Sequence, residues 1–378
     1  MGHDKRDNEE GLMSIEVFWR LPVHGDGRTR CAEQWHRGDY SPHRKSPHPF
    51  ARTGVQRDGY TYYDHLSQIA GAADLARFDG LWIPQSAAGE EPLIVAGAFA
   101  REARHLKFVP ALRAPLLSAV YATKIANSFQ RLSGGRLAWY LVTEEDPENA
   151  WHGRRWSLQE QIERTGEFLD VARGFWNSPP FTYRGKYYEV ENGGFPPALQ
   201  GATMPVVYLS GESDQAYALS ARHADVHVLP LLPIPELRQR IDRVSALAAQ
   251  HGRKVRFAVE ADLVARHTDE EAWSHLRGEW ESLNAKAVSL DSSPLRKPAR
   301  FDEWVGGAYL WSGFGQFRPG ASAGFVGSYE TVAGAVEEYV AAGVSGFVFS
   351  ANPHLEEAYR IGEKLLPRIR ALAAARAA

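Results

Sequence analysis

At 378 residues, the chain is long for one average domain but within the usual length of a barrel of alternating strands and helices. Its formal net charge of −3, from 43 Lys and Arg against 46 Asp and Glu, gives no reason to expect nucleic acid as a partner. A single cysteine, Cys31, excludes an intramolecular disulfide and a cysteine-rich metal site, and we predict no metal centre. No apolar run is long enough to span a bilayer and the N-terminus is polar, so we expect a cytoplasmic protein without membrane contact.

Segments typical of strands and of helices alternate along the chain. The predicted strands are short, mostly apolar runs: Ile15–Val23, Gly80–Gln85, Leu106–Arg113, Leu137–Thr143, Pro205–Ser210, Val226–Leu232, Val255–Ala265 and Val344–Ser350. The predicted helices are Tyr63–Phe78, Pro92–Arg101, Ser118–Leu132, Leu158–Trp176, Asp214–His223, Pro235–Gln250, Asp269–Leu283, Tyr329–Ala342 and Leu355–Ala374. Strands that are apolar throughout suit a parallel sheet covered on both faces. Eight such strands with helices between them predict an α/β fold, the (β/α)8 TIM barrel.

Three long insertions interrupt this alternation. They follow strand 1 (Gly25–Tyr62), follow helix 4 (Phe181–Pro197) and precede the last strand–helix unit (Asn284–Phe325). The second contains Arg184-Gly185-Lys186, which predicts a hairpin. Loops of this length in a barrel are typical of functional lids or disordered segments. We expect residues 1–12 to be a disordered tail and residues 13–378 to form one barrel domain.

Polar residues stand where the predicted strands end, and that is where such barrels place their active sites. His24 ends the first strand, and His354 follows the last one after Asn352-Pro353. Each histidine is a candidate proton or hydrogen-bond donor, or a structural residue that bonds to the nearby backbone.

Two carboxylates lie on the seventh predicted strand. Glu260 and Asp262 are two residues apart and therefore share one face, while Val259, Ala261 and Leu263 form the apolar alternate set. If they face the barrel interior, the two carboxylates can bind a cation, act as acid and base, or pair with arginine. If they face outward, they form a solvated edge. The apolar alternate set favours the inward orientation.

The turn Ser210-Gly211-Glu212-Ser213 opens a predicted helix. Small residues with free N–H groups at a helix N-terminus can hold a phosphate, but Ser213 or Asp214 is equally a plain N-cap. Glu212 would repel a phosphate if its side chain pointed inward.

Several motifs together resemble the alkanesulfonate monooxygenases of the bacterial luciferase-like group. They are Phe18-Trp19-Arg20-Leu21-Pro22-Val23-His24-Gly25-Asp26-Gly27, Arg131-Leu132-Ser133-Gly134-Gly135-Arg136, Leu141-Val142-Thr143, His251-Gly252-Arg253-Lys254-Val255-Arg256-Phe257, Leu310-Trp311-Ser312-Gly313-Phe314-Gly315 with Arg318, and Pro353–Arg360. Apart from the N-terminal tail, the resemblance covers nearly the whole chain.

The resemblance implies a two-component monooxygenase. Such enzymes take reduced FMN from a separate NAD(P)H:flavin reductase, and O2 adds to the flavin to form a C4a-peroxide that attacks a small organic substrate. It further implies a homodimer or homotetramer, or a heterodimer with a homologue.

The same resemblance assigns roles to single residues. The active-site positions are His24, Arg318 and His354, where Arg318 falls on a loop that closes over the flavin. The flavin region includes Thr143, Tyr140, Ser210, Gly211 and Ser213. Trp19, Asn352 and Gly89 fall in the substrate pocket.

Several departures from the family pattern change the charge of the site, and Gly89 and Asn352 depart from it as well, in place of a cysteine and a tyrosine. Glu260 and Asp262 replace an arginine and a histidine that suit a sulfonate, so the pocket is predicted to change from cationic to acidic. A neutral or amine-bearing substrate is the resulting hypothesis. In the flavin region the departures are Tyr140, Glu144, Ile162 and Glu212. The alternative to an enzyme is therefore a non-catalytic or specialised subunit of a heteromeric luciferase-like protein, with weak or no flavin binding.

Overall fold

The structure, a computed structural model, describes residues 15–23, 62–85, 89–143, 156–290, 300–316 and 321–377. Eight parallel strands form its closed barrel, in the order β1-β2-β3-β4-β7-β8-β9-β12, with β12 pairing back to β1 and β8 pairing to β9. Their bounds are β1 Glu16–Arg20, β2 Gly80–Ile83, β3 Lys107–Leu112, β4 Ala138–Leu141, β7 Val206–Leu209, β8 Val226–Pro230, β9 Arg256–Arg266 and β12 Val344–Ser350. The predicted (β/α)8 barrel and its eight strands are confirmed.

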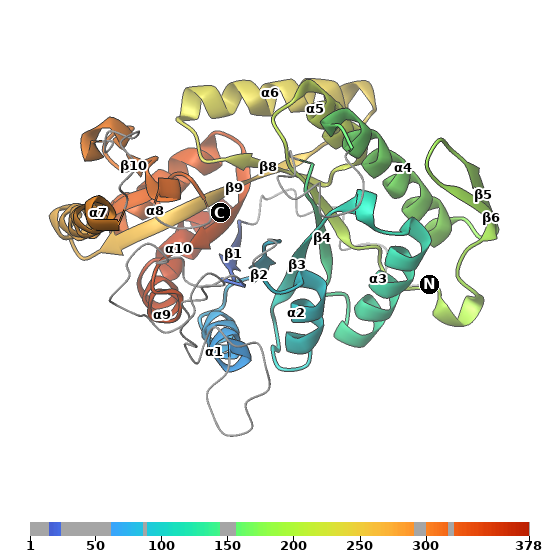
Figure 1. The fold of residues 1–378 in the computed structure, drawn as a ribbon, viewed down its shortest axis with the longest axis horizontal. Helices are drawn as coiled ribbons and strands as arrows, with labels where there is room; N and C mark the ends of the chain where they lie inside the picture. Colours follow the sequence, from blue (N-terminus) through green and yellow to red (C-terminus); the bar gives the residue numbers. More distant parts are fainter. Residues whose placement is uncertain are drawn as a thin grey trace.

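Helices surround the barrel (Figure 1). They are α1 Tyr62–Leu75, α2 Pro92–Phe99, α3 Ala119–Ser133, α4 Leu158–Asn177, α5 Asp214–His223, α6 Ile234–Gln250, α7 Asp269–Leu290, α8 Tyr329–Ala341, α9 His354–Lys364 and α10 Leu366–Ala377. The last predicted helix, Leu355–Ala374, is two helices in the structure, because Pro367 has no N–H to bond the preceding turn and a new helix begins one residue before it. None of the helices in these ranges is long and apolar enough to cross a lipid bilayer.

Two of the predicted insertions carry ordered structure. The hairpin prediction is confirmed, because β5 (Phe181–Arg184) and β6 (Glu189–Gly193) pair antiparallel beside α4 (Figure 1). The segment before the last unit continues α7 to Leu290 and then adds β10 (Leu310–Trp311) and β11 (Gly324–Ser328). β11 pairs with the second half of β9, so β9 extends beyond the barrel. The tail 1–12 and nearly all of the first insertion lie outside the described residues.

The alternation of side chains divides the packing into an inner and an outer core. Inside the barrel, Phe18, Trp82, Tyr140 and Tyr208 pack with small aliphatic residues. Between the barrel and the helices lies a much larger apolar layer. A third cluster, built around Trp280, Trp311 and other aromatic residues, fills the space between α7 and the β10–β11 addition.

Ion pairs between charged side chains close the N-terminal end of the barrel. The carboxylate of Glu16 lies 2.6 Å from Lys107 Nζ and 3.1 Å from Arg256 Nη1. Burial raises the pKa of Glu16, but the two cations outweigh it and hold that pKa below its ordinary value. Ligand access is therefore left to the opposite, C-terminal end, where barrels of this kind place their sites.

A buried histidine between the barrel and the helices predicts that acid lowers the stability of the folded protein. His227 on β8 is fully buried, and its Nδ1 lies 2.8 Å from Ser220 Oγ. Burial lowers its pKa from 6.5 to about 4. The folded protein therefore keeps His227 neutral while the unfolded chain binds a proton below pH 6.5, and each pH unit between 6.5 and 4 should remove roughly 1.4 kcal/mol of stability.

The measurement is urea unfolding between pH 7 and pH 4.5 for the wild type and for His227→Gln. The variant is less stable at pH 7, since a buried hydrogen bond changes, but its free energy of unfolding should fall less steeply with acidification. An equal slope in both proteins would show that His227 is not responsible.

Candidate active site

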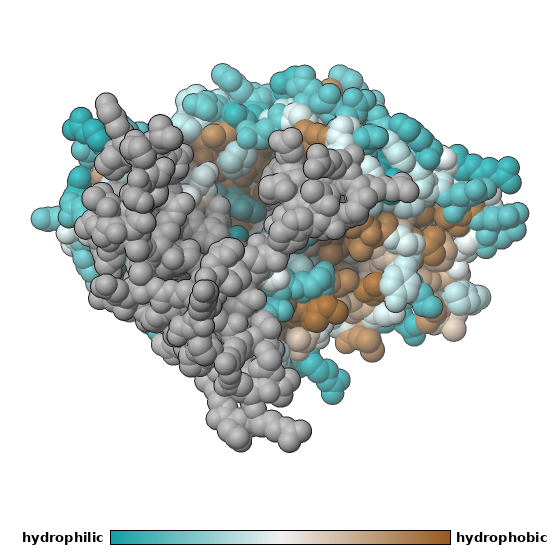
Figure 2. All heavy atoms as spheres, in the orientation of Figure 1, coloured by the Kyte–Doolittle hydropathy of each residue, from teal (hydrophilic) through white to brown (hydrophobic). Residues whose placement is uncertain are grey.

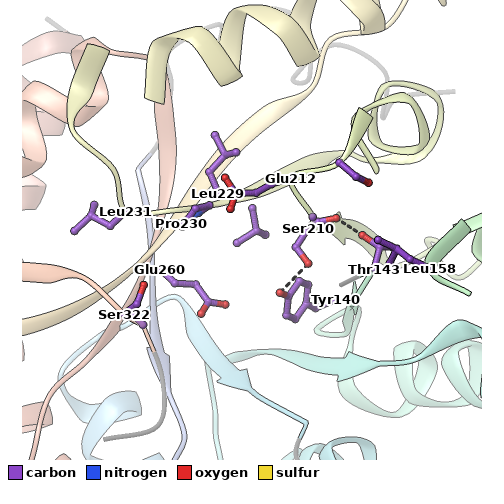
Figure 3. Close-up of a pocket in the computed structure, with 14 residues that line it drawn as sticks. Tyr140, Thr143, Leu158, Ser210, Glu212, Leu229, Pro230, Leu231, Glu260 and Ser322 are labelled. Carbon is purple, nitrogen blue, oxygen red and sulfur yellow. Dashed lines mark hydrogen bonds between the residues drawn. The ribbon is translucent and has the colours of Figure 1, made fainter. Parts of the chain in front are cut away.

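A cavity of about 410 Å³ opens at the C-terminal end of the barrel (Figure 3). Its size is within the range of small-molecule sites. The walls come from β4, β7, β8 and β9, from the segments that follow the first three of these strands, and from the residues before β11. They are Tyr140, Thr143, Leu158, Ser210, Gly211, Glu212, Ser213, Val228, Leu229, Pro230, Leu231, Glu260, Ala321 and Ser322. Six residues that the sequence predicted for the site, those of the flavin region together with Glu260, meet in this one cavity.

A hydrogen-bonded turn forms one end of the cavity. The Thr143 hydroxyl donates to the Ser210 carbonyl oxygen, and the Tyr140 hydroxyl donates to Ser210 Oγ at 3.1 Å. These bonds hold the end of β4 against the end of β7. The turn that follows β7 is thereby positioned at the first residues of α5.

The turn needs a glycine and ends in a helix cap. Gly211 has φ +109°, and a Cβ there would lie 2.8 Å from both Thr143 Oγ1 and the Cβ of Ala216. Ser213 is the N-cap of α5, because its Oγ accepts from the N–H of Ala216 at 3.2 Å. The N-cap interpretation of Ser213 is confirmed. The first turn of a helix has further N–H groups without an acceptor inside the helix, and we predict that they serve a phosphate.

The carboxylate of Glu212 is held by a cation. Arg240 Nε on α6 donates to Glu212 Oε1 at 2.9 Å. An unpaired carboxylate at Glu212 would repel a phosphate bound at this turn. The ion pair with Arg240 weakens that repulsion, because it neutralises the charge of the carboxylate. The residues of the turn therefore fit a phosphate: small side chains, a required glycine, an N-terminal helix end and a compensated carboxylate.

The opposite wall carries Glu260. Figure 3 shows its carboxylate pointing across the cavity toward Tyr140, while Val259 and Ala261 pack in the outer core. The inward orientation favoured by the sequence is confirmed. Asp262 is 1% exposed, and its Oδ1 accepts from the N–H of Leu263 at 2.9 Å.

Sequence reasoning missed a cation beside this pair. Arg20 on β1 is 8% exposed and interacts electrostatically with Glu260, Asp262 and Tyr140. Burial lowers the pKa of Arg20, and the two carboxylates oppose that effect, so the guanidinium stays charged. Strand parity in the sequence predicts this cation, because Phe18 and Arg20 share one face of a strand and a charged residue on the inner face of the barrel needs a partner.

His354 and Trp19 lie together, away from the cavity lining. Trp19 faces the helices because strand alternation turns its neighbours Phe18 and Arg20 inward, and it packs against Phe78 at a centroid distance of 5.2 Å. The His354 ring meets Trp19 edge-on at 5.9 Å and is 6% exposed. The expectation that Trp19 lines the substrate pocket therefore differs from its observed place in the outer core.

The other predicted residues have distinct surroundings. Asn352 is 5% exposed and precedes Pro353 through a cis peptide bond. Gly89 lies in the segment after β2, where the N–H of Glu90 donates to the Val23 carbonyl oxygen at 3.0 Å. His24 and Arg318 lie outside the described residues.

A (β/α)8 barrel with a ligand-sized cavity at the C-terminal ends of its strands is the architecture of many enzymes. The model of the family described as luciferase-like monooxygenase matches residues 46–346, most of the chain. The protein therefore belongs to the luciferase-like monooxygenase family.

Solved structures share the fold at low sequence identity. EDTA monooxygenase (EmoA) from Chelativorans sp. BNC1 is 18% identical with a TM-score of 0.69, covering 95% of this chain and 94% of that one. Long-chain alkane monooxygenase (LadA) is 17% identical with a TM-score of 0.69, covering 95% and 91%. An F420-dependent secondary alcohol dehydrogenase is 13% identical with a TM-score of 0.63, covering 95% and 100%.

Proposed function

We propose that this protein is the oxygenase component of a two-component system that uses reduced FMN, supplied by a separate NAD(P)H:flavin reductase, and O2 to oxidise a small organic substrate. The observation that carries the proposal is the turn Ser210–Ser213, which Thr143 holds in place at the N-terminus of α5. This turn lines the cavity at the C-terminal end of the barrel. Membership of the luciferase-like monooxygenase family and monooxygenases of the same fold support it.

The chain's own residues would bind and orient the cofactor. The N–H groups of the α5 N-terminus with the Ser213 side chain would hold the phosphate, and the Tyr140 hydroxyl would keep Ser210 in place. The apolar wall of β8, with Val228 and Leu229, would exclude water from the ring system. Reduced flavin supplies the electrons for O2, and the protein supplies position and dryness. The active-site roles of His24, Arg318 and His354 remain predictions from the resemblance.

The direct test is an anaerobic titration of the purified protein with photoreduced FMN, followed by a pulse of oxygen. We expect micromolar binding and a transient flavin absorbance that differs from the autoxidation of free reduced FMN. Titration with reduced F420 is the matched control, because a dehydrogenase of this fold depends on that deazaflavin. Binding of reduced F420 without binding of FMN would replace the proposal with a deazaflavin enzyme.

A second candidate function is a specialised subunit of a heteromeric enzyme that binds no flavin. The observation that favours it is charge: within the described ranges, the charged residues in the cavity lining are Glu212 and Glu260, both acidic. No binding of either reduced cofactor at high concentration would favour this candidate.

We also propose that the protein is oligomeric. Exposed apolar side chains lie on α2 and α3, where Ile94 is 73% exposed and Tyr121 and Leu132 are 65% and 89% exposed. Figure 2 shows hydrophobic surface on the side of the molecule where Figure 1 places these helices. Exposed apolar surface of this kind is typical of association sites. The alkanesulfonate-type substrate suggested by the sequence motifs is not part of the proposal, because the residues at the β9 wall are acidic.

A further inference from the structure

The turn proposed to hold the flavin phosphate carries two carboxylates of its own. Glu212 precedes the N-cap Ser213, and Asp214 follows it as the first residue of α5. The N-terminus of a helix attracts negative charge, whether that charge belongs to a side chain or to a bound phosphate. Glu212 and Asp214 can therefore compete with a phosphate for the same positive potential.

Two arginines of α6 pair with these carboxylates. Arg240 Nε donates to Glu212 Oε1 at 2.9 Å, and Arg243 Nη2 lies 2.6 Å from Asp214 Oδ1. Residues three apart lie on one face of a helix, and α6 packs beside α5 (Figure 1). Arg243 also lies over the ring of Tyr217 on α5, at 5.5 Å from the ring centroid. One face of α6 therefore matches both carboxylates of the turn.

The pair of Glu212 with Arg240 is the one that adjoins the cavity. Glu212 is among the residues that line it, and Figure 3 shows its side chain in the cavity wall. The side chains of Glu212 and Arg240 are 52% and 30% exposed, while those of Asp214 and Arg243 are 73% and 54% exposed. Solvent therefore screens the outer pair more strongly than the pair beside the cavity. Exposed ion pairs contribute little to stability, so variants of either pair should fold.

We propose that Arg240 is a positioning residue that makes the site prefer a phosphorylated flavin. Its hydrogen bond directs the Glu212 carboxylate toward α6 and so keeps it from the N–H groups of the α5 N-terminus that a phosphate would use. Without Arg240, the released carboxylate would cap those groups itself and repel the phosphate. The inference deepens the proposed monooxygenase function and rests on it for the identity of the cofactor. Arg243 holds Asp214 in the same way, with a smaller effect because that pair is more exposed.

The test compares reduced FMN with reduced riboflavin, which share the ring system and differ in the phosphate. In anaerobic titrations of the full-length protein at low ionic strength, the wild type should prefer FMN. Arg240→Gln should weaken FMN binding about fivefold, the factor for one pair of charges about 4 Å apart in water, and leave riboflavin binding within about twofold of the wild type. Added NaCl should reduce the loss, because salt screens exposed charges. An equal loss for both flavins, or no loss for FMN, would overturn the inference.

A double-variant cycle shows whether Arg240 acts through Glu212. Glu212→Gln should tighten FMN binding, since it removes the competing charge, and in that background Arg240→Gln should cost much less than it costs in the wild type. Equal losses in the two backgrounds would mean that Arg240 acts on the phosphate by its own charge, which would contradict the positioning role. Arg368→Gln, which breaks an exposed pair with Glu330 on the outer surface, is the matched control and should leave both flavin affinities unchanged.

The wild-type titrations separate this inference from the proposed function. A wild type that binds neither reduced flavin would remove both the flavin-dependent function and the role of Arg240. A wild type that binds reduced FMN, together with an Arg240→Gln variant that keeps the same preference for FMN over riboflavin, would remove only the role of Arg240.

Discussion

Replacing Glu357 by alanine should lower the free energy of unfolding by about 3–5 kcal/mol, because it leaves a buried arginine without its partner. Glu357 on α9 is 1% exposed, and Arg266 at the end of β9 is 8% exposed. Arg266 Nη1 donates to Glu357 Oε2 at 3.2 Å, Arg266 Nη2 lies 3.2 Å from Oε1, and Arg360 also pairs with Glu357. The pair joins the extension of β9 to the helix behind the last strand.

Urea unfolding at pH 7 measures this effect against two comparisons. Glu330→Ala breaks an exposed pair with Arg368 and should cost less than about 1 kcal/mol. The double variant Arg266→Met/Glu357→Leu removes both buried charges and should be more stable than Glu357→Ala alone. A loss for Glu357→Ala no larger than for Glu330→Ala would show that the buried pair is not important for stability.

Replacing Gly211 by alanine should weaken the binding of reduced FMN by about tenfold or more, the expected loss when a hydrogen bond to a charged phosphate is displaced. The new Cβ would lie 2.8 Å from Thr143 Oγ1 and from the Cβ of Ala216, and φ +109° is unfavourable for any side chain. The turn must shift, and with it the N-terminus of α5 that Ser213 caps. Anaerobic titration with photoreduced FMN measures the loss.

The control for this variant is Gly252→Ala, at the end of α6. Gly252 also has a positive φ, +65°, but a Cβ there meets no atom within 4 Å. It should destabilise the backbone to a modest extent and leave flavin affinity unchanged. A folded Gly211→Ala protein that binds reduced FMN as well as the wild type does would show that the turn is not the phosphate site.

Part of the site could be predicted from strand pattern and part only from the resemblance. Ser210 follows from the end of a strand and Glu260 from the parity of one, while Tyr140 was predicted from the resemblance, and the three meet in one cavity. Arg20 was not predicted because it lies within the predicted strand and not at its end, although its parity with Phe18 places it inside the barrel. The predicted role of Trp19 came from the resemblance, whereas strand alternation places its side chain in the outer core.

Local pattern by itself determined the eight strands, the helices that separate them and the face that each strand residue presents. These properties depend on hydrophobic periodicity and on residues such as glycine and proline, whose effects are short-range. Only the tertiary structure decided which charges neutralise one another. Arg20 lies near Glu260 and Asp262 because β1 and β9 flank β12. Glu212, in the turn before α5, pairs with Arg240 on the neighbouring helix α6. Such pairs join residues that are separated in the chain, and only the closure of the barrel or the packing of its helices brings them within the range of a Coulomb interaction.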